Sequence, residues 1–421
     1  IPEPTHPRKI ADNLPMPELT LTLTGMAHGG LALGRDRGGR AIFVPFAIPG
    51  ETVRVRVPDN ARGFARAELL EVLTPSAGRV VPRCRHFGIC GICHLQHMSY
   101  EAQLRAKEAA ARDQLSRVAG LKNPALRPIR PAPEAYGYRA ETALFTAEPD
   151  GLGYWSPAEQ RIFAVEECPI LQPALEAALP NLDVDLPRLR RISLRLGDDE
   201  ELMAALEVED VEPPQLAADF AISVAIVLPD RTAASLIGDP YLLQTINGRS
   251  YRFSPGVAYP SSPAAAEQLA GTIVELSDLA SDDVLLESPA AAGWLTAALA
   301  ERAAEVFAVE PNPDAVADAA ENLDAFDNVS LFEASEVMAF PALPVEPDVV
   351  VLRPENGLSP AALELLRRLR PRRRVVVTGE AGPLAKDAKQ LGKLGYRPLA
   401  FQPLDLLPQS YQVEVVSVWR K

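Results

Sequence analysis

The sequence predicts a protein of three folded parts: a small antiparallel β-barrel, a central α+β part with a cysteine cluster, and a C-terminal doubly wound α/β domain. The chain has 421 residues, which is too long for one hydrophobic core. Short alternating strands with Gly and Pro at the turns fill the N-terminal part, as in a five-stranded barrel. Apolar strands that alternate with helical segments begin near Asp282, which indicates a mostly parallel sheet.

The boundaries are placed where these patterns change. The first segment has no periodicity and reads as a flexible tail, and the long middle segment mixes short strands with proline-rich connections. The expected parts are a tail over residues 1–16, a barrel over 17–76, a cysteine-cluster and α+β domain over 77–245, and an α/β domain over 246–421.

One amphipathic helix is expected within the central part, over residues 99–119. Ser99 is a suitable N-cap and Gly120 a suitable stop. This helix is a candidate to pack on the C-terminal domain.

Charge is distributed unevenly along the chain. The net charge is −14, but basic residues outnumber acidic ones over residues 1–130 and the reverse holds afterwards. A basic front suits RNA and an acidic rear does not, although simple solubility is the alternative explanation. No apolar run is long enough to span a membrane, and the predicted location is cytoplasmic, with no DNA or membrane partner. The candidate RNA-binding residues on the barrel are Arg35, Arg37, Arg40, Arg54, Arg62 and Arg66.

Three of the four cysteines, Cys84, Cys90 and Cys93, have the spacing C-x5-C-x2-C, and Cys168 is the fourth. Disulfides are not expected in a cytosolic chain. Four thiolates, three close in sequence and one remote, suit an iron–sulphur cluster. Zinc is the alternative, either with four thiolates or with one of the nearby histidines in place of a thiolate. A third reading is buried cysteines without a ligand.

Two acidic residues end neighbouring strands of the predicted α/β domain. Glu287 ends the first strand and Glu310 the second. Ligands of doubly wound sheets bind at the carboxyl ends of the strands, and an acid at the end of the second strand is placed to hold ribose hydroxyls.

Several segments carry a resemblance to a known family. They read IFVPFAIPGETVRVRV (42–57), PRCRHFGICGICHLQHMSYEAQLRAK (82–107), YGYR (136–139), CPIL (168–171) and LDLLPQSYQVEVVSVWR (404–420). On these segments, which lie within residues 18–421, the chain resembles the RNA 5-methyluridine methyltransferases of the TrmA/RumA type. The resemblance implies an OB-like TRAM barrel, a central domain with a 4Fe–4S cluster on the four cysteines, and a class I domain that uses S-adenosylmethionine. It also implies a structured RNA partner, ribosomal or transfer RNA.

The chain departs from the family at its catalytic and cofactor positions. The family's nucleophilic cysteine adds to the uracil ring, and Gly379 stands in its place. Glu414 matches the general base. Among the cofactor motifs Glu287, Gly293 and Glu310 are retained. The replaced positions are Pro260 for a glutamine, Ala291 for a glycine, Ser335 and Arg353 for aspartates, and Asn356 for an arginine.

These departures predict an RNA-binding, cluster-bearing protein without methyltransferase activity. Every cysteine is assigned to the cluster, so no thiol remains to attack a uracil. The eroded motifs also argue against binding of S-adenosylmethionine. The alternatives are a working S-adenosylmethionine-dependent RNA methyltransferase with an atypical site, and a protein–protein adaptor.

Overall fold

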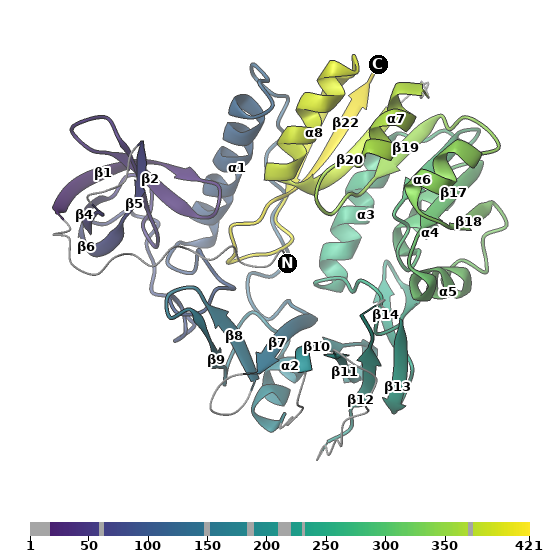
Figure 1. The fold of residues 1–421 in the computed structure, drawn as a ribbon, viewed down its shortest axis with the longest axis horizontal. Coiled ribbons are helices and arrows are strands. Elements are labelled where there is room, and N and C mark those ends of the chain that lie inside the picture. The colour runs from purple at the N-terminus through teal and green to yellow at the C-terminus, as the bar shows by residue number, and fades with distance from the viewer. Residues whose placement is uncertain are drawn as a thin grey trace.

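The computed structural model describes residues 17–58, 63–146, 152–182, 189–208, 220–229, 232–368 and 374–421. The barrel lies on one side of the molecule, the central sheet below, and the C-terminal domain on the other side of helix α1 (Figure 1). The predicted tail over residues 1–16 lies outside the described residues. In the part of the chain that the structure describes, no helix combines the length and apolarity of a membrane span.

The barrel has six strands rather than the five expected. The residues from Phe64 to Leu73 read as one strand in the sequence, but the strand breaks at Ala67, whose amide donates to the Phe43 carbonyl (2.9 Å). As a result β5 pairs parallel with β3, while β6 pairs antiparallel with β4 at the other edge of the order β5-β3-β2-β1-β4-β6. The strands are β1 (Glu18–Ala27), β2 (Leu31–Arg35), β3 (Ala41–Val44), β4 (Thr52–Arg56), β5 (Phe64–Arg66) and β6 (Glu68–Thr74).

The turn between β1 and β2 fixes the barrel against the rest of the chain. Gly30 has φ +73°, and a Cβ there would lie 3.3 Å from the Cβ atoms of both His94 and Tyr411. In the same turn the His28 ring lies edge-on to Tyr411, and its Nε2 is 3.5 Å from Oε1 of Glu380. A residue without a side chain is therefore required where the turn meets the cysteine-bearing segment that contains His94.

The central part is built on a seven-stranded sheet in the order β13-β12-β11-β10-β7-β8-β9. Its core includes Cys93 and Cys168, so one cysteine of the clustered three and the remote cysteine are packed into the same hydrophobic interior. The elements are β7 (Glu141–Thr146), β8 (Leu152–Ser156), β9 (Arg161–Ala164), α2 (Pro173–Ala178), β10 (Leu189–Leu196), β11 (Leu202–Val208), β12 (Ser223–Val227) and β13 (Ala233–Ile237), with 3-10 turns at Leu179–Asn181 and Asp198–Glu200.

The C-terminal domain is a doubly wound sheet in the order β18-β17-β16-β19-β20-β22-β21, parallel from β18 to β20, with β22 antiparallel to both neighbours. The strand order reverses between β16 and β19. A hairpin of β14 (Leu242–Ile246) and β15 (Arg249–Phe253) precedes it. The strands are β16 (Val284–Ser288), β17 (Glu305–Glu310), β18 (Val329–Glu333), β19 (Val349–Leu352), β20 (Arg374–Glu380), β21 (Arg397–Leu404) and β22 (Glu414–Arg420).

Helices cover both faces of this sheet, which explains why its strands read as continuous apolar runs. Side chains of α3, α4 and α5 pack on one face. Side chains of α1, α7 and α8 pack on the other. The helices are α3 (Pro263–Ser277), α4 (Trp294–Ala300), α5 (Pro313–Asn322), α6 (Glu336–Ala339), α7 (Pro360–Arg368) and α8 (Ala381–Lys393), with a 3-10 turn at Phe340–Ala342.

Helix α1 (Tyr100–Arg117) belongs to the cluster segment in sequence but packs against α8. The hydroxyl of Ser99 caps it by accepting from the amide of Ala102 (3.4 Å), and Gly120 follows its end with φ +74°. Its buried face includes Ala111 and Leu115, which join the core of the C-terminal domain.

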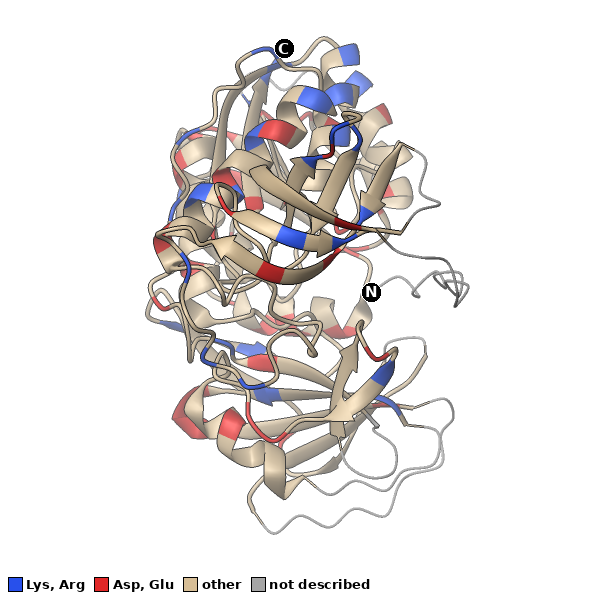
Figure 2. Ribbon diagram, turned by 90° about the vertical axis from the view of Figure 1, so that its left-hand side faces the viewer, with Lys and Arg blue, Asp and Glu red and all other residues tan. Residues whose placement is uncertain are grey.

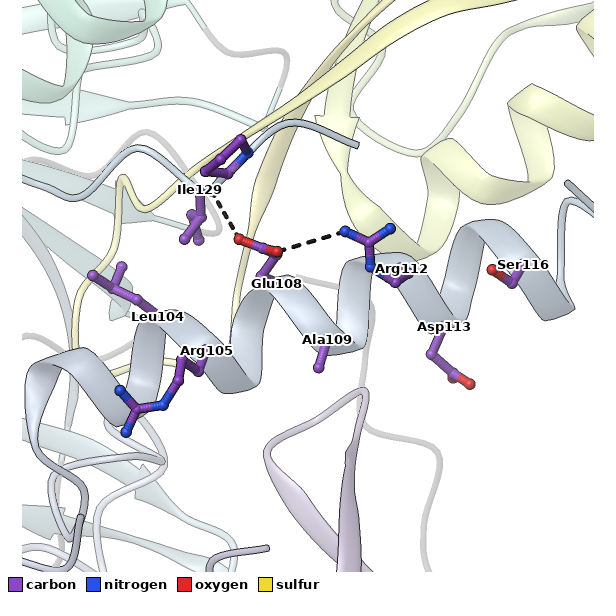
Figure 3. Close-up of a pocket in the computed structure, with 9 residues that line it drawn as sticks. Leu104, Arg105, Glu108, Ala109, Arg112, Asp113, Ser116 and Ile129 are labelled. Atoms are coloured by element: carbon purple, nitrogen blue, oxygen red, sulfur yellow. Dashed lines mark hydrogen bonds and ion pairs between the residues drawn. The ribbon is translucent and has the colours of Figure 1, made fainter. Parts of the chain in front are cut away.

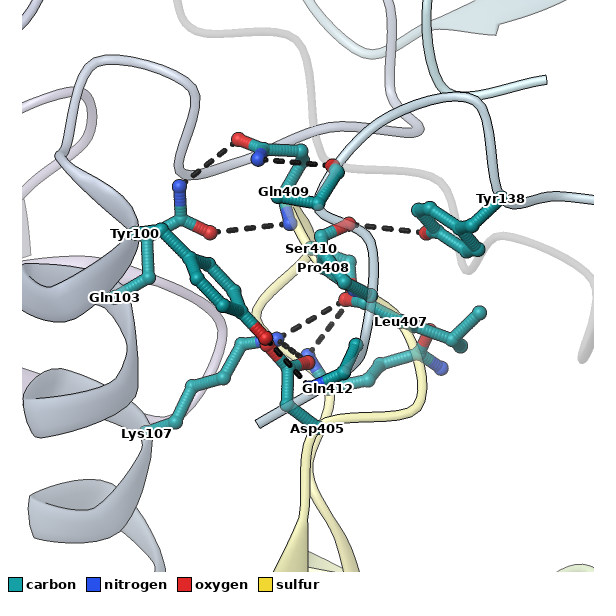
Figure 4. A network of polar contacts seen from close by, with 12 residues as sticks. Tyr100, Gln103, Lys107, Tyr138, Asp405, Leu407, Pro408, Gln409, Ser410 and Gln412 are labelled. Carbon is teal, nitrogen blue, oxygen red and sulfur yellow. Dashed lines mark hydrogen bonds and ion pairs between the residues drawn. The ribbon is translucent and has the colours of Figure 1, made fainter. Parts of the chain in front are cut away.

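A buried polar network joins α1 to the loop between β21 and β22 (Figure 4). Nζ of Lys107 donates to Oδ1 of Asp405 (2.6 Å) and to the Leu407 carbonyl (3.0 Å). One turn earlier, Gln103 exchanges two hydrogen bonds with Gln409. The side chains of Lys107 and Asp405 are 1% and 0% exposed, so this ion pair is fully desolvated. Such a pair holds its two segments in one register because either charge alone is costly to bury.

We expect Lys107→Met to reduce the free energy of unfolding by about 3–5 kcal/mol, because it leaves the Asp405 carboxylate buried without its cation. The double variant Lys107→Met/Asp405→Leu should recover most of that loss. Urea denaturation measures both, with Arg105→Met, on the exposed side of α1, as a control that changes stability by at most about 0.5 kcal/mol. A Lys107→Met protein as stable as the control would show that the pair contributes no net stability.

Candidate functional site

All four cysteines line one cavity. Cys84, Cys90 and Cys93 reach it from the segment between β6 and α1, and Cys168 from the segment after β9. None of them forms a disulfide. The remote cysteine is therefore brought to the other three, as the sequence predicted.

The surroundings of these thiols disfavour a bare thiolate. Burial raises the pKa of Cys90 and of Cys93 to about 12, and it also raises the pKa of Cys84 and Cys168. The other cysteines add repulsion if more than one loses its proton. A bound cation would reverse this balance, since metal ligation requires thiolates. Within the described ranges, however, no three His, Cys, Asp or Glu side chains are grouped as a bound metal ion requires.

The three nearby histidines do not act together. His86 lines the cysteine cavity. His94 lies edge-on to Tyr411, and His97 lies against Phe87. Burial lowers the pKa of His94 and of His97 to about 4, so both imidazoles are neutral at pH 7. Only His86 is placed near the thiols.

A second cavity, of about 490 Å³, opens at the carboxyl ends of the parallel strands. Ser288 ends β16, Glu310 ends β17, Glu336 begins the helix after β18, and Arg353 follows β19, and all four line it. The cavity spans the point where the strand order reverses, which is the usual ligand position in this kind of sheet.

Glu310 lies at this cavity, as the sequence predicted for an acid ending the second strand. Its two carboxylate oxygens accept from the amides of Asn312 and Ala291, both at 2.8 Å. Burial raises the pKa of Glu310, and the two amides offset part of the rise. Ala291 has φ +50°, a conformation that favours glycine.

Glu287 and Gly293 are not among the residues that line the cavity. Gly293 has φ +82° at the start of α4, and a Cβ there would lie 2.9 Å from Cδ1 of Leu323, the residue that follows α5. Its lack of a side chain is explained by helix packing alone. Glu287 is fully buried, and neither of its oxygens has a hydrogen-bond partner among the described residues.

Arg353 places a positive charge among buried carboxylates. Its guanidinium lies 5.0 Å from the Trp294 ring centre, and its Nη1 is buried without a partner in the described part of the chain. Burial raises the pKa of Glu287, Glu310 and Glu414, and the charge of Arg353 offsets part of the rise in each case. Arg353 is also one of the residues that line the cavity.

Gly379 lies in β20, one residue from the end of the strand. The nearest atom to a Cβ built on Gly379 is the Pro354 carbonyl oxygen, at 3.7 Å, so a cysteine would fit there. The neighbouring Thr378 donates to Oε1 of Glu414 (2.6 Å). Burial raises the pKa of Glu414, and this hydrogen bond offsets part of the rise. Glu414, the base that the resemblance implies, thus lies on β22, the strand that pairs with the Gly379 strand β20.

The barrel arginines differ in their pairing. Arg40 pairs with Asp36, and Arg54 pairs with Glu71. Arg35, Arg37 and Arg66 are exposed and form no ion pair with a described residue, while Arg62 lies outside the described residues. Lys and Arg are interspersed with Asp and Glu along the barrel strands (Figure 2).

A cavity of about 290 Å³ on the central sheet was not predicted, and Arg139, Arg191 and Arg195 line it. Two acids in the same lining, Glu207 and Glu141, pair with Arg191 and Arg195. This cavity shares Gly256 and Ala258 with the cavity at the carboxyl ends of the parallel strands (the strand-end cavity), so the two cavities adjoin. Arg191 and Arg195 are four residues apart in β10 and therefore lie on the same face of the strand. This spacing could have predicted an arginine-lined surface there.

A further hollow runs along α1 (Figure 3). Its charges neutralise one another, because Arg112 pairs with Glu108 and Asp113 pairs with Arg117. Glu108 also accepts from the amide of Ile129 (3.1 Å). These contacts supply partners for the charged side chains along the hollow, so their arrangement is explained without a ligand.

The comparisons with known proteins agree with this geometry. Residues 17–70 match the TRAM domain family. The chain is 30% identical to the 23S rRNA (uracil(1939)-C(5))-methyltransferase RlmD of Pectobacterium atrosepticum, over 96% of this chain and 94% of that protein. The chain belongs to the RNA uracil-C5 methyltransferase family.

Other relatives of the family cover the chain equally fully. An uncharacterized RNA methyltransferase of Halalkalibacterium halodurans is 28% identical over 94% of this chain and 96% of that protein. The crystal structure of the Pyrococcus abyssi tRNA (uracil-54, C5)-methyltransferase with S-adenosyl-L-homocysteine has the same fold, with a TM-score of 0.72 and 22% identity. The match covers 95% of this chain and 100% of the Pyrococcus abyssi chain. The TRAM barrel and the Rossmann-like methyltransferase fold are therefore present.

The buried Glu287 predicts a pH dependence of stability. Burial raises its pKa from 4.5 to about 7, and Arg353 offsets part of the rise. Between these values the folded chain holds a proton that the unfolded chain has lost, so this group's contribution to stability falls as the pH rises from 4.5 to 7. We expect Glu287→Gln to be more stable than the wild type at pH 8, by up to about 3 kcal/mol, and equal to it near pH 4.5. Denaturation curves with a pH-independent difference between the two proteins would contradict this.

Proposed function

We propose that the protein binds structured RNA, carries a 4Fe–4S cluster on Cys84, Cys90, Cys93 and Cys168, and does not methylate uracil. The observation that carries the proposal is the shared cavity of the four cysteines. It takes up every thiol in the chain and leaves Gly379 at the nucleophile position.

RNA as the partner is supported by two findings. The TRAM match covers the barrel, and the full-length relatives are RNA methyltransferases, including one for 23S rRNA. The barrel also exposes arginines without ion pairs to described residues, which are free to contact phosphates. A ribosomal or transfer RNA is the expected class of ligand.

Uracil C5 methylation in this family proceeds through a thiolate that adds to the ring, after which a base removes the ring proton. Here Glu414 stands in the place of the base, while all four cysteines line a different cavity. The closest hydroxyl belongs to Thr378, which is 2% exposed and already donates to Glu414. A buried hydroxyl cannot reach a uracil ring, so the addition step has no nucleophile, and without the adduct the base has no activated ring proton to remove.

The cysteine cavity fits a cluster in its chemistry. Four sulphurs from two distant segments line it, and the amide of Ile92 donates to Sγ of Cys90 (3.4 Å), as amides do to cluster sulphurs. When bound, a cluster supplies the positive charge that the buried thiolates require and cross-links the segment before α1 to the segment after β9. Zinc on the same thiolates is the alternative.

Anaerobically purified protein should be brown and contain about four iron atoms per chain. Cys168→Ala should lose most of the iron, because it removes the ligand from the second segment. His86→Gln, beside the thiols but outside the ligand set, is the matched control and should keep its iron. Iron and sulphide analysis measures all three proteins. Colourless, zinc-containing wild-type protein would overturn the cluster.

A working methyltransferase is the second candidate, because the strand-end cavity is open and Glu310 lines it. Against it stands Arg353, whose cation occupies a site where the family has an aspartate and where S-adenosylmethionine would bring a second cation. A protein–protein adaptor is the third candidate, and it predicts no RNA binding.

RNA that contains 5-fluorouridine distinguishes the candidates, because a nucleophile that adds to the ring stays covalently attached to this analogue. With S-adenosylmethionine, the wild-type protein should give no adduct with this RNA on a denaturing gel, and no 5-methyluridine by mass spectrometry in RNA that contains ordinary uridine. Gly379→Cys, which the space at this position admits, is the matched variant that supplies a nucleophile. Adduct or 5-methyluridine formed by the wild type would show that the protein is an active methyltransferase.

A further inference from the structure

Two aromatic rings and two arginines occupy adjacent positions on the outer face of the barrel. In the β2–β3 and β3–β5 pairings, Arg35 is opposite Ala41, which in turn is opposite Phe64. Two residues along, Phe43 is opposite Arg66. The alternate residues Ile42 and Ala65 are buried in the barrel core, so the first set points outward.

Phe64 is unusually open for its size. Its side chain is 63% exposed on the edge strand β5, and its ring centre lies 6.0 Å from that of Phe43 at an interplanar angle of 76°. This edge-to-face contact supports the Phe64 ring from one side. A single exposed apolar side chain needs no explanation, but an exposed ring held by a second ring and flanked by cations does.

The cations beside these rings are not neutralised by the protein. Arg35 donates to the Gly39 carbonyl (2.9 Å) and, like Arg66, has no ion pair with any described residue. On the opposite edge of the barrel, Arg54 pairs with Glu71 and Arg56 with Glu68. Free positive charge is therefore concentrated on the edge of the barrel that carries the rings.

We propose that Phe64 stacks on an unpaired base of an RNA strand whose phosphates contact Arg35 and Arg66. Base stacking on an aromatic ring with arginines along the backbone is the usual way that barrels of this kind hold single-stranded RNA. A protein partner would need a broader apolar surface, and the intervening positions carry only the half-buried Leu33 and Ala41. This inference rests on the proposed RNA-binding function and names the residue that reads a base.

The test uses the full-length protein and a stem–loop RNA whose unpaired loop contains 2-aminopurine. Stacking should quench the fluorescence of this base. Phe64→Ala should weaken binding about tenfold and abolish the quenching, while Phe64→Tyr restores both. Arg66→Gln should instead reduce the slope of log affinity against log salt by about 0.7, since it removes one phosphate contact.

Leu73→Ala is the matched control, because Leu73 is 46% exposed on β6 at the other edge of the same barrel. It should bind RNA like the wild type, and thermal melts should show all variants folded. If the wild type binds RNA and Phe64→Ala binds it equally well, the stacking site is wrong although the RNA-binding function stands. If the wild type binds no RNA, both are wrong, and a barrel that captures only protein supports the adaptor.

Discussion

The ion pair between Lys107 and Asp405 joins residues 298 positions apart, and the positions of the other parts depend on it. It fixes α1 to the loop between β21 and β22, and that loop reaches both neighbouring parts. Amides of His94 and Leu95, in the cluster segment, donate to the Gln409 carbonyl, and Tyr138 of the central part donates to the Pro408 carbonyl (3.0 Å). The barrel turn then packs against Tyr411. One desolvated pair thus anchors the loop that contacts the barrel turn, the cysteine-bearing segment and the central part.

Under the proposed function, the chain keeps the family's architecture without its chemistry. The barrel and the cysteine cavity are packed into hydrophobic cores of their own, and Glu414 accepts a hydrogen bond from Thr378. Gly379 and Arg353 lie elsewhere, in β20 and directly after β19. In this proposal, residues at those two positions can change while the RNA-binding barrel stays intact.

Much of this organisation follows from the sequence because it is local. Ser99 predicts the start of α1, and the apolar runs predict β16 to β20 to within one residue. The break at Ala67 could not be predicted, because it depends on a hydrogen bond to Phe43 in another strand. Lys107 reads as an exposed helix position, and only the packing of a segment from the other end of the chain makes it buried. The cysteine set was predictable because its members share a rare residue type, whereas the role of Phe64 depends on strand register.

The central claim is that all four thiols hold one cluster and none is free for chemistry. Alkylation of native, anaerobically purified protein with iodoacetamide, followed by mass spectrometry, tests this claim directly. The account predicts no modified cysteine while the metal is bound, and modification of Cys84, Cys90, Cys93 and Cys168 together once it is removed by acid. Rapid alkylation of one cysteine in fully loaded protein would contradict it, because that thiol would be available as a nucleophile.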